Sequence, residues 1–367
     1  MSFEDHLTQL LDTWIRPELQ DIAAYPVADA RGLIKLDAME NPYPWPDALR
    51  KEWQNALIRA EVNRYPDPTG GEIRELLRTA LALPTGQEIL LGNGSDELIQ
   101  LLMLAVGGAG RTVLFVEPSF VMYQMIARFT GTATVGVPLT ADFELDREDL
   151  LAAIAKHRPA LVFLAYPNNP TGNLFDAGIL AAVIAASPGL VIIDEAYAPF
   201  TDASFIPRLG QSPNLLVMRT LSKMGLAGLR LGYLAGPAAW IAAINKLRLP
   251  YNINTLTQIS VALALRHPAP FASQTAAIRQ ERTRLAVALM ALPDDVQVFP
   301  SEANFLLFRV LKRPANAVFA SIKRQGILIK NLQGHHPMLS GCLRVTVGQP
   351  GENDAFLAAL RASLAED

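Results

Sequence analysis

The sequence predicts an α/β protein with a large three-layer domain, built around a mostly parallel central sheet, and a smaller α+β domain. Apolar runs of strand length alternate with helix-length segments between residues 45 and 255, as in successive βαβ units. Most of these runs are continuously apolar, which is expected of strands buried on both faces of a parallel sheet. After residue 255 the runs become shorter, which indicates a change of architecture.

The large domain, residues 45–255, contains strand-like runs at Glu88–Asn93, Thr112–Pro118, Ala160–Pro167, Leu190–Asp194, Leu215–Thr220 and Gly232–Gly236. The helix-like segments among them are Asp96–Val106, Phe120–Thr130, Asp146–Lys156 and Asp176–Ala186. Ligands of such sheets bind beyond the carboxyl ends of the strands. The functional residues are therefore expected at that edge.

The small domain is assigned to residues 1–44 and 256–367. A helical stretch from Thr257 to Leu292, with a proline-containing break near His267, leads into shorter strands and a last helix at Glu352–Leu364. The first 40 or so residues are too few to form a hydrophobic core alone, so we expect them to pack with this domain.

Composition excludes several classes of protein. Half of the 367 residues are hydrophobic and 18% are charged, which suits a well-buried enzyme core. The net charge of −3 gives no electrostatic reason to expect a nucleic acid or an anionic membrane as partner. The single cysteine, Cys342, excludes an internal disulfide framework and predicts a reducing, cytoplasmic location.

Neither a membrane span nor a metal site is predicted. The longest apolar stretch, residues 177–193, is interrupted at residues 187–189 and is typical of a helix, a turn and a strand. The adjacent His335 and His336 lack further spaced ligands, so we interpret them as solvated side chains.

Three polar residues follow successive strand-like runs. Lys223 lies in RTLSK, Asp194 ends LVIID, and Asn169 lies in NNPTG. These groups are suited to holding pyridoxal phosphate (PLP) as a Schiff base and using it as an electron sink. Burial and a nearby cation such as Arg230 disfavour the charged form of Lys223, and its free amine can then act as a general base.

Two aromatic residues are candidates for contacts with the cofactor ring. Tyr197, three residues after Asp194, can donate a hydrogen bond to the phenolic oxygen, as can Asn169. Phe120 begins a helix-like segment and can stack on the ring, although an ordinary core position explains it almost equally well.

The segment LGNGSDE supplies a candidate phosphate site. Ser95 and Asp96 open a helix after a strand-like run, and helix N-termini bind anions. Ser222 and Arg230 can complete this site. A dinucleotide fingerprint would need glycine at the position of Glu97, so that alternative fails.

Arg344 and Lys330 are candidates for the substrate. Arg344, in CLRVTVG, lies between apolar residues, and buried arginines are rare unless they are paired or bind an anion. We interpret it as the group that binds the substrate anion, with an internal salt bridge as the alternative. Lys330 is a weaker second cation.

The combination of NNPTG, VIIDEAY, TLSKMGLAGLR and CLRVTVG resembles the class II, fold-type-I PLP-dependent aminotransferases, and within them the histidinol-phosphate aminotransferases. The resemblance covers almost the whole chain. It implies Lys223 as the Schiff-base lysine, Asp194 as the partner of the pyridine nitrogen, and Tyr197 and Asn169 as donors to the ring oxygen.

The resemblance also implies a phosphate site, a stacking residue and substrate contacts. The residues assigned to the cofactor in these ways are Ser95, Asp96, Phe120, Ser222 and Arg230. Those assigned to the substrate are Tyr25, Asn41, Lys330 and Arg344. Tyr65, in NRYP, is expected to reach the cofactor phosphate of a second subunit, which implies a homodimer with shared active sites.

The activity implied by the resemblance is ping-pong transfer of an amino group between histidinol phosphate and 2-oxoglutarate, within histidine biosynthesis. Aromatic amino-acid transamination and decarboxylation of a phosphorylated amino acid remain alternatives on the same scaffold. The chain departs from many relatives at two points. Lys223 and Arg230 are one residue closer in sequence than in those relatives. Lys330 stands where many of them have an arginine, and a lysine cannot form the paired, bidentate hydrogen bonds of a guanidinium.

Overall fold

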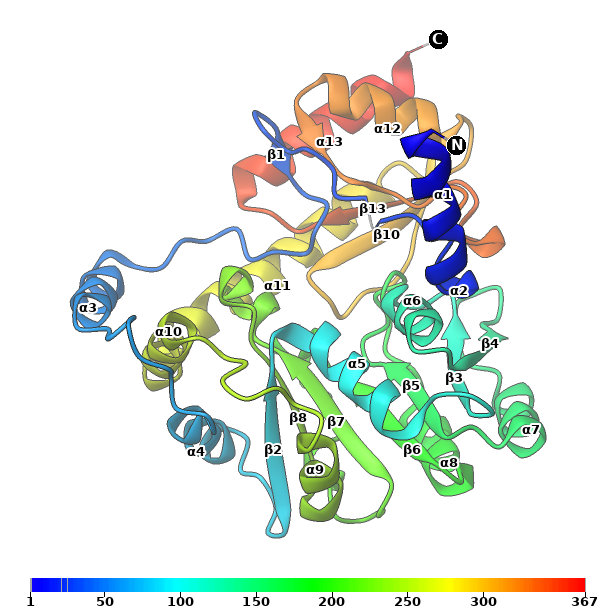
Figure 1. Ribbon diagram of the computed structural model, residues 1–367. Helices are drawn as coiled ribbons and strands as arrows, with labels where there is room; N and C mark the ends of the chain where they lie inside the picture. The colour runs from blue at the N-terminus through cyan, green and yellow to red at the C-terminus, as the bar shows by residue number, and fades with distance from the viewer. Residues whose placement is uncertain (1, 21, 25, 367) are drawn as a thin grey trace.

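The computed structural model of the protein describes residues 2–20, 22–24 and 26–366. It contains a large sheet flanked by helices and a smaller sheet covered by the C-terminal helices (Figure 1). The predicted fold class is therefore confirmed, while the proposed division at residues 44–45 and 255–256 stays a prediction.

The large sheet has the strand order β2-β8-β7-β6-β5-β3-β4. Its strands are β2 (Gln87–Gly92), β3 (Thr112–Glu117), β4 (Ala133–Pro138), β5 (Leu161–Ala165), β6 (Leu190–Asp194), β7 (Leu215–Thr220) and β8 (Gly232–Pro237). Strand β8 is antiparallel to both of its neighbours, β2 and β7, and the other pairs are parallel. The sequence did not predict β4, because this edge strand is only partly buried and lacks a continuous apolar run.

Helices cover both faces of this sheet. One face packs against α5 (Gly94–Val106), α6 (Met122–Phe129) and α9 (Ala238–Asn245). The other packs against α4 (Gly71–Ala80), α7 (Arg147–His157), α8 (Ala177–Ala186) and α10 (Thr255–Arg266). Alternate residues of a strand enter the two cores, as Phe163 and Leu164 of β5 do, which explains the continuously apolar runs.

The small sheet is antiparallel, with the order β12-β13-β10-β9. Its strands are β9 (Val296–Val298), β10 (Phe305–Val310), β12 (Lys330–Asn331) and β13 (Cys342–Thr346). A third core joins it to α11 (Pro268–Met290), α12 (Ala315–Arg324) and α13 (Pro350–Ala365). The predicted break near His267 is confirmed, because α10 ends at Arg266 and Pro268 begins α11.

The segment before the large sheet contacts both parts of the molecule. It contains α1 (Phe3–Trp14), α2 (Pro17–Gln20), β1 (Ile34–Lys35) and α3 (Asp47–Ile58). Strand β1 pairs with β11 (Ile327–Leu328), whereas α2 contacts α6 and α3 contacts α10. The 3-10 helices are η1 (Ala198–Phe200), η2 (Ile206–Arg208), η3 (Ser222–Met224), η4 (Ala227–Leu229) and η5 (Pro337–Leu339). None of the described helices is long and apolar enough to cross a membrane.

Candidate active site

A cavity of about 380 Å³ lies at the carboxyl ends of the parallel strands β5, β6 and β7. Nine residues that the sequence singled out line it together. They are Ser95, Asp96, Phe120, Asn169, Asp194, Tyr197, Ser222, Lys223 and Arg230. The cavity therefore combines a primary amine, a buried carboxylate, aromatic and amide side chains, and a helix N-terminus.

Asp194 is the last residue of β6 and is 3% exposed. Its Oδ1 accepts a hydrogen bond from the backbone N–H of Ala196 at 3.0 Å, and its Oδ2 accepts one from the Tyr123 hydroxyl at 2.6 Å. Burial raises the pKa of Asp194 to about 6, although both hydrogen bonds oppose that rise. The carboxylate is thus buried, fixed on both oxygens and still part of the cavity wall.

Lys223 lies in η3, immediately after β7. Its Nζ donates a hydrogen bond to the carbonyl oxygen of Ala38 at 3.2 Å. Burial, followed by the charge of Arg344, lowers the pKa of Lys223 from its usual 10.5 to about 8. A substantial fraction of the amine is therefore unprotonated and nucleophilic near neutral or mildly alkaline pH.

The N-terminus of α5 forms one end of the cavity. Gly94 has φ +79°, and a Cβ atom there would lie 2.6 Å from Nη2 of Arg230. A Cβ atom at Gly232 would lie 2.8 Å from the backbone nitrogen of Ser95. These two glycines let β8, Arg230 and the first turn of α5 approach closely, with Ser95 and Asp96 at the cavity.

The shorter spacing between Lys223 and Arg230 does not remove Arg230 from the site. Arg230 adopts a left-handed backbone conformation with φ +50° after η4. Its Nη2 lies 3.3 Å from a carboxylate oxygen of Asp96, and its side chain lines the cavity.

Arg344 lies on β13 and is 6% exposed. Its guanidinium donates to Oδ1 of Asn169 and, at 3.1 Å, to the carbonyl oxygen of Asp37. Lys330 on β12 is directly opposite Arg344 in the β12–β13 register. Burial, and then the charge of Arg344, lowers the pKa of Lys330, so the two cations are close enough to affect each other.

Asn41 and Tyr65 are not among the residues that line the cavity. The amide of Asn41 donates to the carbonyl of Met224 at 3.1 Å and to Oε1 of Gln274 at 3.0 Å. Tyr65 is 81% exposed and stacks on Tyr251, with ring centroids 4.4 Å apart. Tyr25 lies outside the described residues. The substrate and partner-subunit roles of these residues stay predictions.

Sequence reasoning missed Tyr123 and the segment Ala38–Glu40. Tyr123 contacts Asp194 from 71 positions away in sequence, on a helix face that looks like ordinary core. Ala38, Met39 and Glu40 line the cavity, and Ala38 does so partly through a backbone carbonyl, which no residue type reveals.

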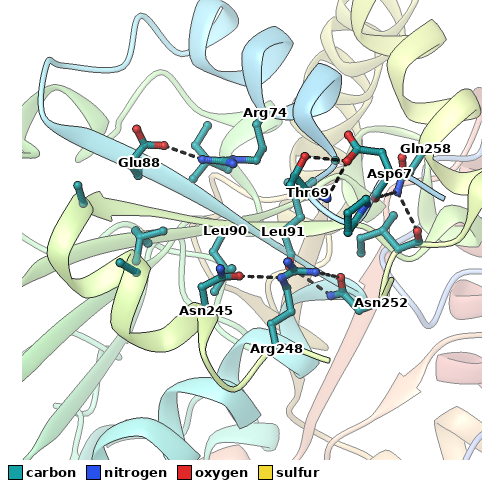
Figure 2. A pocket seen from close by; sticks show the side chains of 17 residues that line it. Asp67, Thr69, Arg74, Glu88, Leu90, Leu91, Asn245, Arg248, Asn252 and Gln258 are labelled. Atoms are coloured by element: carbon teal, nitrogen blue, oxygen red, sulfur yellow. Dashed lines mark hydrogen bonds and ion pairs between the residues drawn. The ribbon is translucent and has the colours of Figure 1, made fainter. Parts of the chain in front are cut away.

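A second cavity, of about 220 Å³, lies along the edge strand β2 and contains none of the predicted site residues. Figure 2 shows Arg74 with Glu88, and Arg248 with Asn245 and Asn252, around this strand. This cavity has no lysine among its lining residues. Across the described part of the chain, no group of three His, Cys, Asp or Glu side chains is placed to hold a metal ion.

The cavity around Lys223 and Asp194 has the groups that PLP requires. Its weakly basic lysine can form the covalent bond, the buried carboxylate can pair with a protonated pyridine nitrogen, and the α5 N-terminus with Arg230 can bind a phosphate. Together with the mostly parallel seven-stranded sheet, this site defines a PLP-dependent transferase of fold type I.

Comparisons with known proteins identify the family. The profile described as "Aminotransferase class I and II" matches residues 31–360, and the chain belongs to this PLP-dependent family. Histidinol-phosphate aminotransferase 2 of Nitrosococcus oceani is 56% identical over 349 residues, covering 95% of this chain and 97% of the relative. Histidinol-phosphate aminotransferase of Chromobacterium violaceum is 52% identical over 347 residues, covering 95% and 97%.

A solved structure shows the same fold. The crystal structure of histidinol-phosphate aminotransferase from Sinorhizobium meliloti in complex with pyridoxal-5'-phosphate has a TM-score of 0.85 and 24% sequence identity. The match covers 96% of this chain and 98% of that chain.

Substitution of Gly232 by alanine is expected to weaken PLP binding. The added Cβ would overlap the backbone of Gly94 and Ser95, so the first turn of α5 must move away from the position predicted for the phosphate. We expect the dissociation constant of PLP to rise on the order of 10- to 100-fold. The control is Gly351→Ala, where a Cβ meets open space. Equal PLP affinity in the Gly232 variant and the wild type would contradict this geometry.

Substitution of Lys223 by methionine is expected to stabilise the apoprotein at neutral pH. The folded-state pKa is below the usual value, so protonation of Lys223 opposes folding. That penalty is complete below about pH 8 and disappears as the pH rises towards 10.5. We expect a gain on the order of 1–3 kcal/mol in the free energy of unfolding at pH 7.

The measurement is urea unfolding of the cofactor-free protein at fixed protein concentration, at pH 7 and at pH 9.5. Lys156→Met, on the exposed side of α7, removes the same charge without relieving burial and is the control. A gain that persists unchanged at the higher pH, or that the control reproduces, would show that burial of the amine is not its cause.

Proposed function

We propose that this aminotransferase interconverts histidinol phosphate and 2-oxoglutarate with imidazole-acetol phosphate and glutamate in histidine biosynthesis. The observation that carries the proposal is the juxtaposition of the Lys223 and Asp194 cavity with two neighbouring cations, Arg344 and Lys330. The names and the 56% and 52% identities of the two relatives described above support this choice of substrate.

The chain's own residues divide the chemistry among them. Bound PLP supplies an electron sink for the pair of electrons left when a proton leaves Cα of the substrate. Asp194 favours a protonated pyridine nitrogen, because a buried carboxylate is stabilised by an adjacent positive charge. Asn169 and Tyr197 line the cavity and are suited to donate to the phenolic oxygen.

Lys223 has two roles in this proposal. Its nucleophilic amine attaches the cofactor, and once the substrate has displaced it, the same amine can accept the proton from substrate Cα. A pKa of about 8 suits this work, because a general base is most effective when its pKa lies near the operating pH.

Arg344 and Lys330 fit substrates that carry anionic groups. Arg344 presents a planar, always charged guanidinium, and Lys330 contributes a second charge from the adjacent strand. Glutamate offers a carboxylate and histidinol phosphate offers a phosphate, so one pair of cations can serve both half-reactions. Aromatic amino acids and phosphorylated amino acids also carry an anion, so these alternative activities must be separated by kinetics.

A homodimer is part of the proposal. Tyr65 is 81% exposed, and it lies in sequence among other exposed apolar residues on α3 and the following loop, Ile58 at 82% and Val62 at 72%. Tyr251, which stacks on Tyr65, is flanked by Leu249 at 72% exposure. Burial of such residues favours association of two subunits. We further propose a cytoplasmic location, which the single cysteine supports, and no nucleic-acid or membrane partner.

A single half-reaction tests the choice of substrate. We expect histidinol phosphate to bleach the visible absorbance of the PLP-loaded enzyme much faster than phenylalanine does, because only the former offers a phosphate to Arg344 and Lys330. Stopped-flow absorbance at equal amine concentrations measures both rates, with glutamate as the second natural donor.

Faster bleaching by phenylalanine would move the assignment to an aromatic transaminase. Release of carbon dioxide from a phosphorylated amino acid would instead favour the decarboxylase. An enzyme with no visible absorbance after incubation with PLP would contradict the proposed cofactor site.

Complementation between two inactive variants tests the shared site. Lys223→Ala and Tyr65→Ala are each expected to be nearly inactive, but a refolded equal mixture should regain about a quarter of wild-type activity. In a mixed dimer, one site combines the intact Lys223 of one subunit with the intact Tyr65 of the other. Activity that stays at the average of the two variants would place Tyr65 in its own subunit's site or outside catalysis.

A further inference from the structure

Tyr123 is a buried tyrosine that contacts two residues lining the cavity, Phe120 and Asp194. It lies on α6 with no exposed surface, and its ring stacks on Phe163 of β5, with centroids 4.6 Å apart and an interplanar angle of 11°. Phe120, which lines the cavity, packs against it edge-on at 5.6 Å. The ring of Tyr123 is therefore held by packing on both the sheet side and the cavity side.

The hydroxyl of Tyr123 donates a hydrogen bond to Oδ2 of Asp194 at 2.6 Å. Burial, and then the charge of Asp194, raises the pKa of Tyr123 well above its usual value. The hydroxyl therefore keeps its proton, and the hydrogen bond runs from tyrosine to carboxylate. The backbone N–H of Ala196 occupies the other carboxylate oxygen at 3.0 Å.

This hydrogen bond opposes the effect of burial on Asp194. Desolvation is the largest influence and favours the neutral acid, and the nearby Asp96 and Glu195 act in the same direction. The Tyr123 hydroxyl is the largest influence that favours the carboxylate. Both side chains are almost fully buried, so bulk water does not compete for this hydrogen bond.

We propose that Tyr123 is a positioning residue that fixes the Asp194 carboxylate and keeps it charged towards the pyridine nitrogen of PLP. The inference rests on the proposed function, since it assigns Tyr123 to the same cofactor site. A purely structural role would require only the ring, whereas this role requires the hydroxyl.

The test is Tyr123→Phe, which keeps the stacked ring and removes the hydroxyl alone. We expect the dissociation constant of PLP from the apoprotein to rise about tenfold or more. The midpoint of the visible-absorbance pH titration should move to higher pH, because a less positive ring nitrogen withdraws less electron density from the rest of the bound cofactor. We also expect kcat to fall by a larger factor than KM changes.

Tyr166→Phe is the matched control. Tyr166 is also a buried tyrosine in contact with a phenylalanine, but it packs against Phe205 in the core on the opposite face of the sheet. Its hydroxyl has no contact with Asp194, so PLP affinity and the absorbance titration should match those of the wild type. Circular dichroism of both variants checks that each is folded.

A double-mutant cycle with Asp194→Asn separates an effect of Tyr123 on the Asp194 carboxylate from a purely structural role of Tyr123. If Tyr123 acts through the charge of Asp194, Tyr123→Phe should weaken PLP binding far less in the Asp194→Asn background than in the wild type. Equal losses in the two backgrounds would overturn the inference, as would wild-type affinity and titration in Tyr123→Phe. Failure of the wild-type protein to bind PLP would instead overturn the proposed function.

Discussion

The burial of the Lys223 amine is the constraint on which the rest of the site depends. An ammonium group loses hydration when it is buried, so the neutral amine becomes accessible at a pH where a solvated lysine is fully charged. Burial of Asp194 likewise raises the pKa of its carboxyl, so the cavity holds both a weakened base, Lys223, and a weakened acid, Asp194. A cofactor with a carbonyl carbon, a basic ring nitrogen and a phosphate satisfies each of these groups at once.

The parallel sheet brings these groups together. Strands β5, β6 and β7 end side by side, so the loops that carry Asn169, Tyr197 and Lys223 open into one cavity. The small sheet adds Arg344, whose guanidinium donates to Asn169. The proposed cofactor contact and the proposed substrate contact are thus joined by one hydrogen bond between the two sheets.

Much of this arrangement could be predicted because its signals are local. Continuous apolar runs located six strands of the large sheet, and the motifs around Lys223 and Asp194 placed polar groups at their ends. The edge strand β4 has no such signal because it is partly exposed. Tyr123 escaped prediction because the role proposed for it depends on one hydroxyl contact with a residue 71 positions away in sequence. The position of Asn41 behind the Lys223 turn likewise follows from tertiary hydrogen bonds and not from spacing.

Chemical trapping of the cofactor tests the central claim most directly. The enzyme would be loaded with PLP, reduced with borohydride, digested with trypsin and analysed by mass spectrometry. We expect the reduced cofactor on Lys223, within the uncleaved peptide of residues 220–230. Cofactor attached to another lysine, or to none, would contradict the assignment of Lys223 and of the cavity built around it.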